Sequence, residues 1–578
     1  MTDILEQLVS QGVITPAQRE RARAAQAAGA PLDEALLSQE DAQEERVLRS
    51  LGEAFGVPWA DVEGRPPARE FLAAFPARVL MERKLLPLRE EADGVTLVAG
   101  SRLFDTTGLD ELRLASGREV RLAVAPSAEI DRWLKRCLGV GADTVQSMVA
   151  DGGVQVVDHE PDDGVDLSEA AQDASIVKFV NEILVEAINL RATDVHFEPF
   201  EDELRVRYRV DGVLQEAAIP GDVRRFRAAI ISRLKILSHL DIAEKRLPQD
   251  GRIKLRIEER DIDVRVSVIP MLHGEGVVLR LLDRGAALLG MESLGMSAAD
   301  CASFERLLDL PHGIILVTGP TGSGKTTTLY AALSRINKPD LKIVTIEDPV
   351  EYQLRGINQI QVSSKAGLTF ARGLRSILRH DPDVVLVGEI RDLETAEIAV
   401  QASLTGHLVF STLHTNDAPG ALTRLVDMGV EPYLVASSLE AVLAQRLVRV
   451  ICPECRERLP EAEVERARRQ YDLKELAGLW AGRGCRRCQG LGYRGRTGIF
   501  ELMMVTDDVR GLILDRPPAG VIRKAAQTHG MKSLREDGWR VAAEGRTTVE
   551  EVLRATKDER LAMNGWTTPA ASGAAGAG

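Results

Sequence analysis

Short apolar runs that alternate with helical stretches dominate the second half of this chain. The runs are residues 314–317, 343–346, 384–387 and 408–412. Helical stretches, notably residues 393–404, separate them. Apolar strands between helices are typical of a largely parallel sheet with helices on both faces. Ligands of such sheets bind where the strands end. The pattern therefore predicts an α/β domain over residues 285–506, with its functional residues after its strands.

A helix followed by strands is predicted before this domain. Apolar residues recur at helical spacing over residues 176–188, with Ser175 as the expected N-cap. Apolar and arginine side chains alternate over residues 204–210, which predicts a strand with three guanidinium groups on one face. Asp211-Gly212 then predicts a hairpin turn. We interpret the arginine face as exposed to solvent, and a subunit or phosphate contact is the alternative.

Composition distinguishes the remaining segments. Residues 1–140 begin with helical spacing from Leu5 to Ile14 and contain no catalytic constellation, so we expect a docking or regulatory module, with a structural role as the alternative. Between Arg136 and Lys178 there are nine Asp or Glu residues and no Lys or Arg, which predicts a mobile linker. The ligand spacing of a calcium loop is missing there. Helical segments and a tail of small residues, expected to be disordered, end the chain.

Length and charge narrow the class of protein. A chain of 578 residues needs several domains, at about 150 residues each. A net charge of −14 and an aromatic content of 4% argue against a broad nucleic-acid-binding surface. The N-terminus lacks a secretory signal, and no apolar run approaches the ~18 residues that cross a bilayer. We therefore expect a cytoplasmic protein that another component recruits to any membrane where it works.

A phosphate-binding loop directly follows the first apolar run. The sequence GPTGSGKT at residues 319–326 fits the pattern G-x-x-x-x-G-K-[ST], with the required strand before it and helix after it. Lys325 is expected to reach the β- and γ-phosphates, and Thr326 to offer its hydroxyl to Mg²⁺. A glycine-rich turn without a ligand is the alternative. The residues expected to hold the nucleotide are Gly319, Pro320, Thr321, Gly322, Ser323, Gly324, Lys325, Thr326 and Thr327.

Acidic residues follow the second and third apolar runs. Phosphoryl transfer to water needs one carboxylate to hold hydrated Mg²⁺ and another to orient or deprotonate the water. Glu389 is the natural Mg²⁺ carboxylate because it ends an apolar strand. Glu351 is the expected water-activating group, with Glu347 as its competitor. Carboxylates that only cap turns are the alternative for both clusters.

His407 and His414 flank the fourth apolar run. Two histidines at the ends of a strand beside the phosphate loop suggest sensing of the γ-phosphate. A structural role is equally compatible with the pattern, so both interpretations stay open.

Four cysteines form two C-x-x-C pairs, Cys452 with Cys455 and Cys485 with Cys488. The pairs are separated by 29 residues, which is 485 − 455 − 1, so a small helical insertion is expected between them. Four thiolates complete a closed, structural Zn²⁺ site. Two disulfides are the alternative, which a reducing compartment disfavours.

Taken together, these motifs resemble the secretion ATPases that power type II secretion and type IV pilus assembly. The loop 319–326 is similar to that family's Walker A motif, residues 347–351 to its Asp box, and residues 388–392 to its Walker B motif, which ends in Glu. The resemblance extends from about Asp173 to Thr556 and includes the tetracysteine module. It implies a RecA-like P-loop ATPase domain behind an α+β, PAS-like domain, with ATP, Mg²⁺ and Zn²⁺ as cofactors.

The resemblance also implies a homohexamer whose active sites are completed by arginines from across a domain or subunit boundary. The matching positions are Arg265, Arg280, Arg375, Arg379, Arg391 and Arg496. Of these, Arg496 is expected to bind the nucleotide. Residues 443–449 and 495–499 read more like the type II secretion motors than the pilus motors, so ATP hydrolysis that drives pseudopilus assembly and protein export is expected. Pilus assembly is the alternative, and a nucleic-acid-dependent ATPase is disfavoured.

Residues 1–140 resemble the docking domains of the family loosely, which implies binding to an inner-membrane secretion component at its cytoplasmic face. Some relatives bind cyclic di-GMP through a paired glycine/leucine motif in this region. Residues 1–26 keep Gly12-Val13-Ile14 but lack the Arg-Leu-Gly opening, so we do not expect this ligand.

The expected organisation is therefore a multidomain α/β chain. Its segments are an N-terminal docking domain (1–140), an acidic flexible linker (141–172), a PAS-like domain (173–284), a RecA-like ATPase domain (285–506) with a zinc module (450–490), a C-terminal helical segment (507–564) and a disordered tail (565–578).

Overall fold

The computed structural model describes residues 4–39, 41–60, 62, 67–72, 74–139, 173–257, 260–283, 289–471 and 478–556. Contacts divide the chain into two compact units, Met1–Gly285 and Ala286–Gly578. The predicted linker and the predicted disordered tail lie outside the described residues. The α/β multidomain fold class is confirmed.

The first unit begins with a helical part and a small sheet. The helices are α1 (Ile4–Ser10), α2 (Pro16–Ala27), α3 (Leu32–Leu37) and α4 (Glu44–Phe55), which share one apolar core. The sheet has strands β1 (Leu86–Glu90), β2 (Thr96–Gly100) and β3 (Val120–Val124), and α5 (Arg69–Leu72), α6 (Ala77–Arg83), α7 (Thr107–Ser116) and α8 (Ser127–Leu138) accompany it. The helical spacing that reaches Ile14 in the sequence extends past one helix into the turn that follows it. α1 ends at Ser10, and Thr15 caps α2 in a capping box with Gln18.

The second part of this unit is an antiparallel six-stranded sheet with helices packed on its apolar face. The strand order is β6-β5-β4-β9-β8-β7. The strands are β4 (Ala192–Pro199), β5 (Leu204–Val210), β6 (Val213–Glu216), β7 (Gln249–Ile257), β8 (Arg260–Met271) and β9 (Gly274–Asp283). The helices are α11 (Ala174–Asn189), η1 (Gly221–Phe226) and α12 (Arg227–Leu237), and residues of all three belong to the same core as the strands.

The predicted strand 204–210 and its hairpin are confirmed. β5 pairs with β6 from Val210 to Val213, and Asp211 and Gly212 both have positive φ angles, 48° and 87°, as a two-residue hairpin turn requires. The N-cap prediction is wrong by two residues. Asp173 caps α11 and accepts the N–H of Ser175 at 2.7 Å, because an Asp carboxylate competes well for the free N–H groups of a first turn.

The arginine face of β5 is more enclosed than a solvated face. Arg207 pairs with Glu198 of β4 at 2.6 Å, and Arg209 approaches Asp194 at 3.6 Å. The cross-strand register, with Asp194 opposite Arg209, brings these opposite charges together. The arginines of β5 therefore form ion pairs within the sheet.

The second unit contains a seven-stranded sheet of order β12-β11-β13-β14-β10-β15-β18. Its strands are β10 (Gly313–Thr318), β11 (Ile343–Glu347), β12 (Asn358–Gln361), β13 (Val384–Val387), β14 (Leu408–Leu413), β15 (Leu439–Ile451) and β18 (Tyr493–Met504). All neighbours are parallel except β15 and β18. The four predicted apolar strands and the largely parallel sheet are confirmed.

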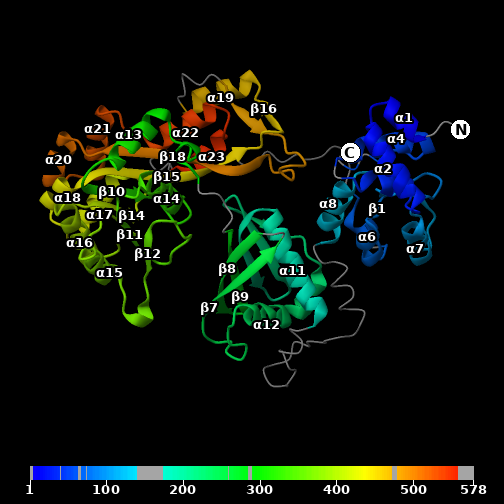
Figure 1. Cartoon of the computed structure of the whole chain (residues 1–578), viewed down its shortest axis with the longest axis horizontal. Helices are drawn as coiled ribbons and strands as arrows, with labels where there is room; N and C mark the ends of the chain where they lie inside the picture. Colours follow the sequence, from blue (N-terminus) through cyan, green and yellow to red (C-terminus); the bar gives the residue numbers. More distant parts are fainter. Residues whose placement is uncertain are drawn as a thin grey trace. The chain divides into compact units, whose positions relative to one another are not determined.

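Helices cover both faces of this sheet (Figure 1). α13 (Ala298–Leu308) and α14 (Lys325–Ile336) pack on one face. The other face carries α15 (Phe370–Ile377), α16 (Leu393–Leu404), α17 (Ala418–Asp427), α18 (Pro432–Ser438), α20 (Asp507–Leu514), α21 (Ala519–Thr528) and α22 (Leu534–Ala543), and α23 (Val549–Ala555) follows them. Short 3₁₀ turns are η2 (Met291–Ser293) and η3 (Ser364–Ala366). The predicted helix 393–404 is confirmed as α16.

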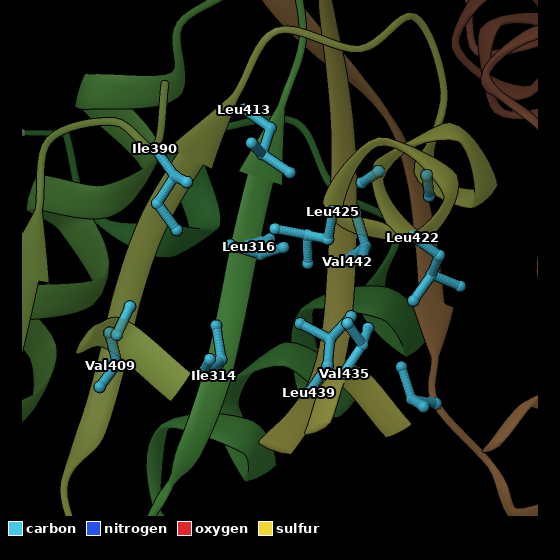
Figure 2. Close-up of a cluster of buried hydrophobic side chains, with 14 of the residues drawn as sticks. Ile314, Leu316, Ile390, Val409, Leu413, Leu422, Leu425, Val435, Leu439 and Val442 are labelled. Carbon is cyan, nitrogen blue, oxygen red and sulfur yellow. The ribbon is translucent and has the colours of Figure 1, made fainter. Parts of the chain in front are cut away.

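Alternation along the strands divides the core into two layers. Ile314 and Leu316 of β10 face the layer with α17 and α18, where Figure 2 shows them among Val409, Leu425 and Val435. Ile315 and Val317 belong to the layer that contains α14. A strand that is apolar at every position is buried on both faces, which the continuous apolar runs had indicated.

A small module interrupts the sheet between β15 and β18. It contains β16 (Arg456–Arg458), α19 (Glu461–Tyr471) and β17 (Trp480–Gly482), and β15 and β18 lead to it as a long two-stranded ribbon (Figure 1). The predicted helical insertion between the cysteine pairs is therefore confirmed as α19. Among the residues that the structure describes, none of the helices combines the length and the apolar content that a membrane crossing requires.

Candidate nucleotide site

The loop between β10 and α14 has the geometry of a phosphate-binding loop. β10 is buried along its whole length, and α14 begins at Lys325 with Gly324 as N-cap at φ 91°. A Cβ on Gly319 would lie 2.6 Å from Gln445 O, and a Cβ on Gly324 would lie 2.7 Å from Gln445 Nε2, so glycine is required at both positions. The loop thus meets the N-terminus of a helix, which favours an anion.

One buried polar group of the loop is suited to a phosphate ligand. Ser323 Oγ is buried and, among the described residues, has no hydrogen-bond partner. Pro320, Thr321 and Gly322 are exposed, whereas Thr326 and Thr327 are half-buried in the first turn of α14. A buried hydroxyl is normally hydrogen-bonded, so an unpaired one at this position fits a phosphate ligand.

Lys325 folds back over the loop. Its Nζ donates to Gly319 O at 2.7 Å and to Pro320 O at 3.2 Å. Burial lowers the pKa of Lys325 to about 8, nearby Glu389 opposes this shift, and the guanidinium of Arg446 adds to it. An added anion would therefore stabilise the charged form of the amine further.

Gln445 and Arg446 are site residues that the sequence analysis missed. Gln445 is buried and its Oε1 accepts the hydroxyl of Thr328 at 2.7 Å. Arg446 donates to the carbonyl of Gln445 at 2.9 Å and to that of Asn416 at 2.7 Å, and burial lowers its pKa. Both follow the part of β15 that pairs with β10, although β15 itself continues to Ile451 beside β18. No motif marks them in the sequence, because their place beside the loop depends on the pairing of β15 with β10.

Glu389 lies at the same edge of the sheet. It follows β13, it forms an ion pair with Arg391 and a hydrogen bond with His414 Nε2 at 3.1 Å, and its side chain is 13% exposed. The electrostatic interaction with Lys325 places its carboxylate near the phosphate loop. The structure therefore brings together Lys325, Glu389, Arg391 and His414, which the sequence analysis had assigned to one site.

Glu347 is fully engaged in hydrogen bonds. Its carboxylate accepts the hydroxyls of Tyr330 at 2.5 Å and Thr345 at 2.6 Å, and the amide of Gln359 at 3.2 Å. The residue is 4% exposed. A buried carboxylate with three donors has no access to an attacking water, so Glu347 is a poor competitor for the half-buried Glu351.

The two histidines lie at opposite ends of β14. β14 runs parallel to β10, with Gly313 opposite Leu408 and Thr318 opposite Leu413. His414 therefore follows the end that meets the loop. His407 precedes the other end, about 20 Å away for six residues at about 3.3 Å each. Its Nδ1 contacts Ala402 O at 2.9 Å at the end of α16. The structure does not place His407 at the phosphate loop, because a parallel strand delivers only the residues after it.

The predicted arginines occupy three different regions. Arg375 pairs with Glu394 at 2.7 Å, and Arg379 donates to Arg375 O at 2.7 Å. Arg496 lies on β18 opposite Arg449. Arg265 and Arg280 belong to the first unit, where they stand opposite each other on β8 and β9, and Arg280 pairs with Asp194 at 3.0 Å. Arg391 contacts Glu389.

The four cysteines of the insertion form a cluster with metal-site dimensions. All four Sγ atoms lie within 4.8 Å of one another. The separations are 3.7 Å for Cys452–Cys485 and for Cys455–Cys488, and 3.8 Å for Cys485–Cys488. Four thiolates at about 2.3 Å from one Zn²⁺ stand about 3.8 Å apart, whereas a disulfide requires about 2.05 Å. The alternative of two disulfides is therefore contradicted, and all four cysteines are free.

Backbone donors support a thiolate at one position of this cluster, Cys488. Cys488 Sγ accepts the N–H groups of Cys485 at 3.1 Å and of Gly492 at 3.2 Å. Burial alone would raise the pKa of Cys488, but these N–H groups bring it to about 7. Cys137 and Cys301 lie outside the cluster and are half-buried. The donor set fits a closed tetrahedral metal site.

Two family models match this chain. The model described as Type II/IV secretion system protein matches residues 169–554, and the model of the MshEN domain matches residues 55–143. The second match lies downstream of residues 1–26, where the cyclic di-GMP motif was sought.

Individual relatives match over most of the chain. A type II secretion system protein E of Pseudomonas aeruginosa is 56% identical over 68% of this chain and 78% of that protein. A type II secretion system protein E of Xanthomonas campestris is 44% identical over 96% of this chain and 99% of that protein. The type IV pilus assembly ATPase PilB of Myxococcus xanthus is 41% identical over 96% and 98%, respectively.

The environment of Lys325 predicts an unusual titration. We expect its amine to titrate with a pKa of about 8, against 10.5 for an ordinary lysine, because burial disfavours the ammonium form. The measurement is ¹³C NMR of the full chain after reductive methylation with labelled formaldehyde, with the resonance assigned by its loss in Lys325→Arg. Mg²⁺ and ATP should raise this pKa, since a neighbouring triphosphate favours the cation. A resonance that titrates near 10.5 would contradict the desolvated position of the amine.

Proposed function

Because this chain belongs to the Type II/IV secretion system protein family, we propose that it hydrolyses ATP to ADP and phosphate to power pseudopilus assembly and protein export in a type II secretion system. The predicted family is confirmed, and with it the ATP-hydrolysing class of enzyme. The observation that carries the proposal is the convergence of the phosphate loop, Glu389 and His414 at one edge of a parallel sheet.

Each residue of this edge has a definite task in the proposed reaction. The N–H groups of residues 319–326 and the amine of Lys325 bind the β- and γ-phosphates. Thr326 and Glu389 would hold Mg²⁺. When bound, that ion neutralises charge that develops on the phosphate oxygens. Glu351 orients the attacking water and accepts its proton.

Glu389 is held in one orientation by two cationic or hydrogen-bonding neighbours. Arg391 and His414 both contact its carboxylate, so these two contacts fix the direction of the side chain. His414 is exposed on the outer side of this contact, where it is suited to respond to the γ-phosphate. His407 lies at the other end of β14, where its Nδ1 contacts Ala402 O, so we assign it no step at the phosphate loop.

The other arginines are proposed to act in an assembled homohexamer. Arg265, Arg280, Arg375, Arg379 and Arg496 match positions that complete the site in the family resemblance. An arginine close to the γ-phosphate stabilises charge in the transition state, with effects of about 10³–10⁵ on rate in related NTPases.

We assign a structural Zn²⁺ to Cys452, Cys455, Cys485 and Cys488. The Sγ separations support this assignment, as do the backbone donors to Cys488. A closed set of four thiolates leaves no position for a substrate, so the ion would tie the ends of β15 and β18 together.

Residues 1–140 are proposed to dock on an inner-membrane component of the secretion system, which would hold the protein at the cytoplasmic face. The match of residues 55–143 to the MshEN domain supports a separate module there. Cyclic di-GMP is not part of the proposal, because residues 1–26 lack the opening of the expected motif.

Pilus assembly is the alternative function within the same family. The relative named PilB is 41% identical over nearly the whole chain, so the pilus branch has a specific observation in its favour. The higher identities to proteins named type II secretion system protein E favour the secretion branch.

Lys325→Ala tests the proposed activity. Loss of the amine removes the positive charge that the phosphates require, so we expect the rate of phosphate release by the full chain to fall at least about 100-fold. Lys524→Ala is the matched control, because Lys524 is exposed on α21. The measurement is steady-state phosphate release with ATP and Mg²⁺, with and without DNA.

Unchanged turnover in Lys325→Ala would contradict the proposed site, and strong stimulation by DNA would favour a nucleic-acid-dependent ATPase. In the source cell, the same substitution separates the two branches. Loss of protein export with pili retained supports type II secretion, whereas loss of pili with export retained supports pilus assembly.

Cys455→Ser tests the metal assignment. We expect about one zinc per chain in the unmodified protein and loss of that zinc in the variant, with a lower thermal unfolding midpoint, since three thiolates no longer close the site. The measurement is atomic emission combined with thermal unfolding, and Cys301→Ser is the control from outside the cluster. Full stability after complete removal of zinc would refute a structural ion.

A further inference from the structure

We infer that Tyr330, Glu347 and Gln359 form a buried hydrogen-bond network that positions Glu351 for the attack of water on the nucleotide. This inference rests on the proposed function and assigns positioning roles to residues outside the phosphate loop.

Tyr330 is the centre of the network. It lies on α14, five residues after Lys325, and is fully buried. Its hydroxyl donates to Glu347 Oε2 at 2.5 Å and accepts the N–H of Glu351 at 3.3 Å. The helix that starts at the phosphate loop therefore holds the backbone of Glu351 directly.

Gln359 holds the same segment from the other side. Its Nε2 donates to Tyr352 O at 3.0 Å and to Glu347 Oε1 at 3.2 Å, and its Oε1 accepts the N–H of Leu354 at 2.7 Å. Gln359 belongs to β12, so the connection between β11 and β12 is fixed by side chains from α14 and from the sheet edge. Glu351 lies between these anchoring points.

Burial of these polar groups costs free energy, so we expect them to serve a purpose other than packing. Burial and the carboxylate of Glu347 raise the pKa of Tyr330, while the N–H groups of Glu351 and Tyr352 act in the opposite direction. Apolar side chains would fill the same volume without the desolvation of a carboxylate. A polar network that is fully satisfied instead fixes one geometry.

We expect disruption of this network to slow the hydrolysis of ATP and to leave nucleotide binding intact. Loss of the Tyr330 hydroxyl removes the acceptor for the Glu351 N–H and a donor to Glu347, so the segment relaxes. A displacement of about 1 Å at a catalytic group can cost about 10²-fold in rate. Lys325 and the loop glycines do not contact the hydroxyl in any hydrogen bond described, so the affinity for ATP should hardly change.

A double-mutant cycle on the full chain tests the inference. We expect Tyr330→Phe to lower kcat about 10- to 100-fold with KM for ATP within about twofold, and Glu351→Gln to lower kcat at least as much. If Tyr330 acts through Glu351, adding Tyr330→Phe to Glu351→Gln should change kcat by less than about twofold. The control is Tyr493→Phe, which loses a comparable hydroxyl contact, to Thr548 at 2.9 Å, and should keep kcat.

Gln359→Met is the second variant, which keeps the test valid if Tyr330→Phe fails to fold. Gln359→Met alone should also lower kcat. Added to Glu351→Gln, it should again leave kcat unchanged. Equal fold-losses in both backgrounds, or a rise in KM without a fall in kcat, would overturn the inference. A normal rate in Glu351→Gln would overturn it too while leaving the ATPase in place, and absence of turnover in the unmodified chain would contradict the proposed function itself.

Discussion

The parallel pairing of β10 with its neighbours is the constraint on which the candidate site depends. β14 lies between β13 and β10, and all three run in one direction, so their carboxyl ends meet at one edge of the sheet. The phosphate loop follows β10, Glu389 follows β13 and His414 follows β14. The hydrogen bond of Thr318 Oγ1 to Leu413 O at 3.1 Å closes this edge. The loop, Glu389 and His414 meet at this edge because parallel strands place the residues that follow them on the same side of the sheet.

The same edge contains buried polar groups that a bound nucleotide would stabilise. Lys325 is held in a desolvated position that lowers its pKa, and Ser323 Oγ is buried without a described partner. Such features reduce the stability of the free protein and are typical of sites that a ligand completes. Gln445 and Glu347, by contrast, are satisfied by neighbouring side chains and hold the site in shape.

Periodicity and motif context were sufficient for much of this architecture. The apolar strands, helix 393–404 and the loop–helix junction are local features, and each is encoded by neighbouring residues. The spacing within each C-x-x-C pair predicted the metal-type cluster, since that spacing is also a feature of neighbouring residues. Ser175 and Asp173 were confused because two N-capping residues stand two positions apart, and only the backbone geometry decides between them.

Other features depended on which distant residues meet. His407 and His414 were grouped because both flank one strand, although they lie at its opposite ends. In the sequence Glu347 resembles a catalytic carboxylate. In the structure its carboxylate accepts hydrogen bonds from Tyr330 and Gln359. Gln445 and Arg446 carry no motif, and their importance follows from the pairing of β15 with β10. The boundaries of the predicted domains and the roles of the site residues stay predictions.

The central claim is that Glu389 serves cleavage of the nucleotide at this edge. A single-turnover experiment with radiolabelled ATP and Mg²⁺ on the full chain tests it most directly, with Glu389→Gln compared against the unmodified protein. The account predicts that the variant still binds ATP but cleaves it at least about 100-fold more slowly, because the neutral amide no longer holds the metal. Cleavage by Glu389→Gln at the unmodified rate would contradict the account.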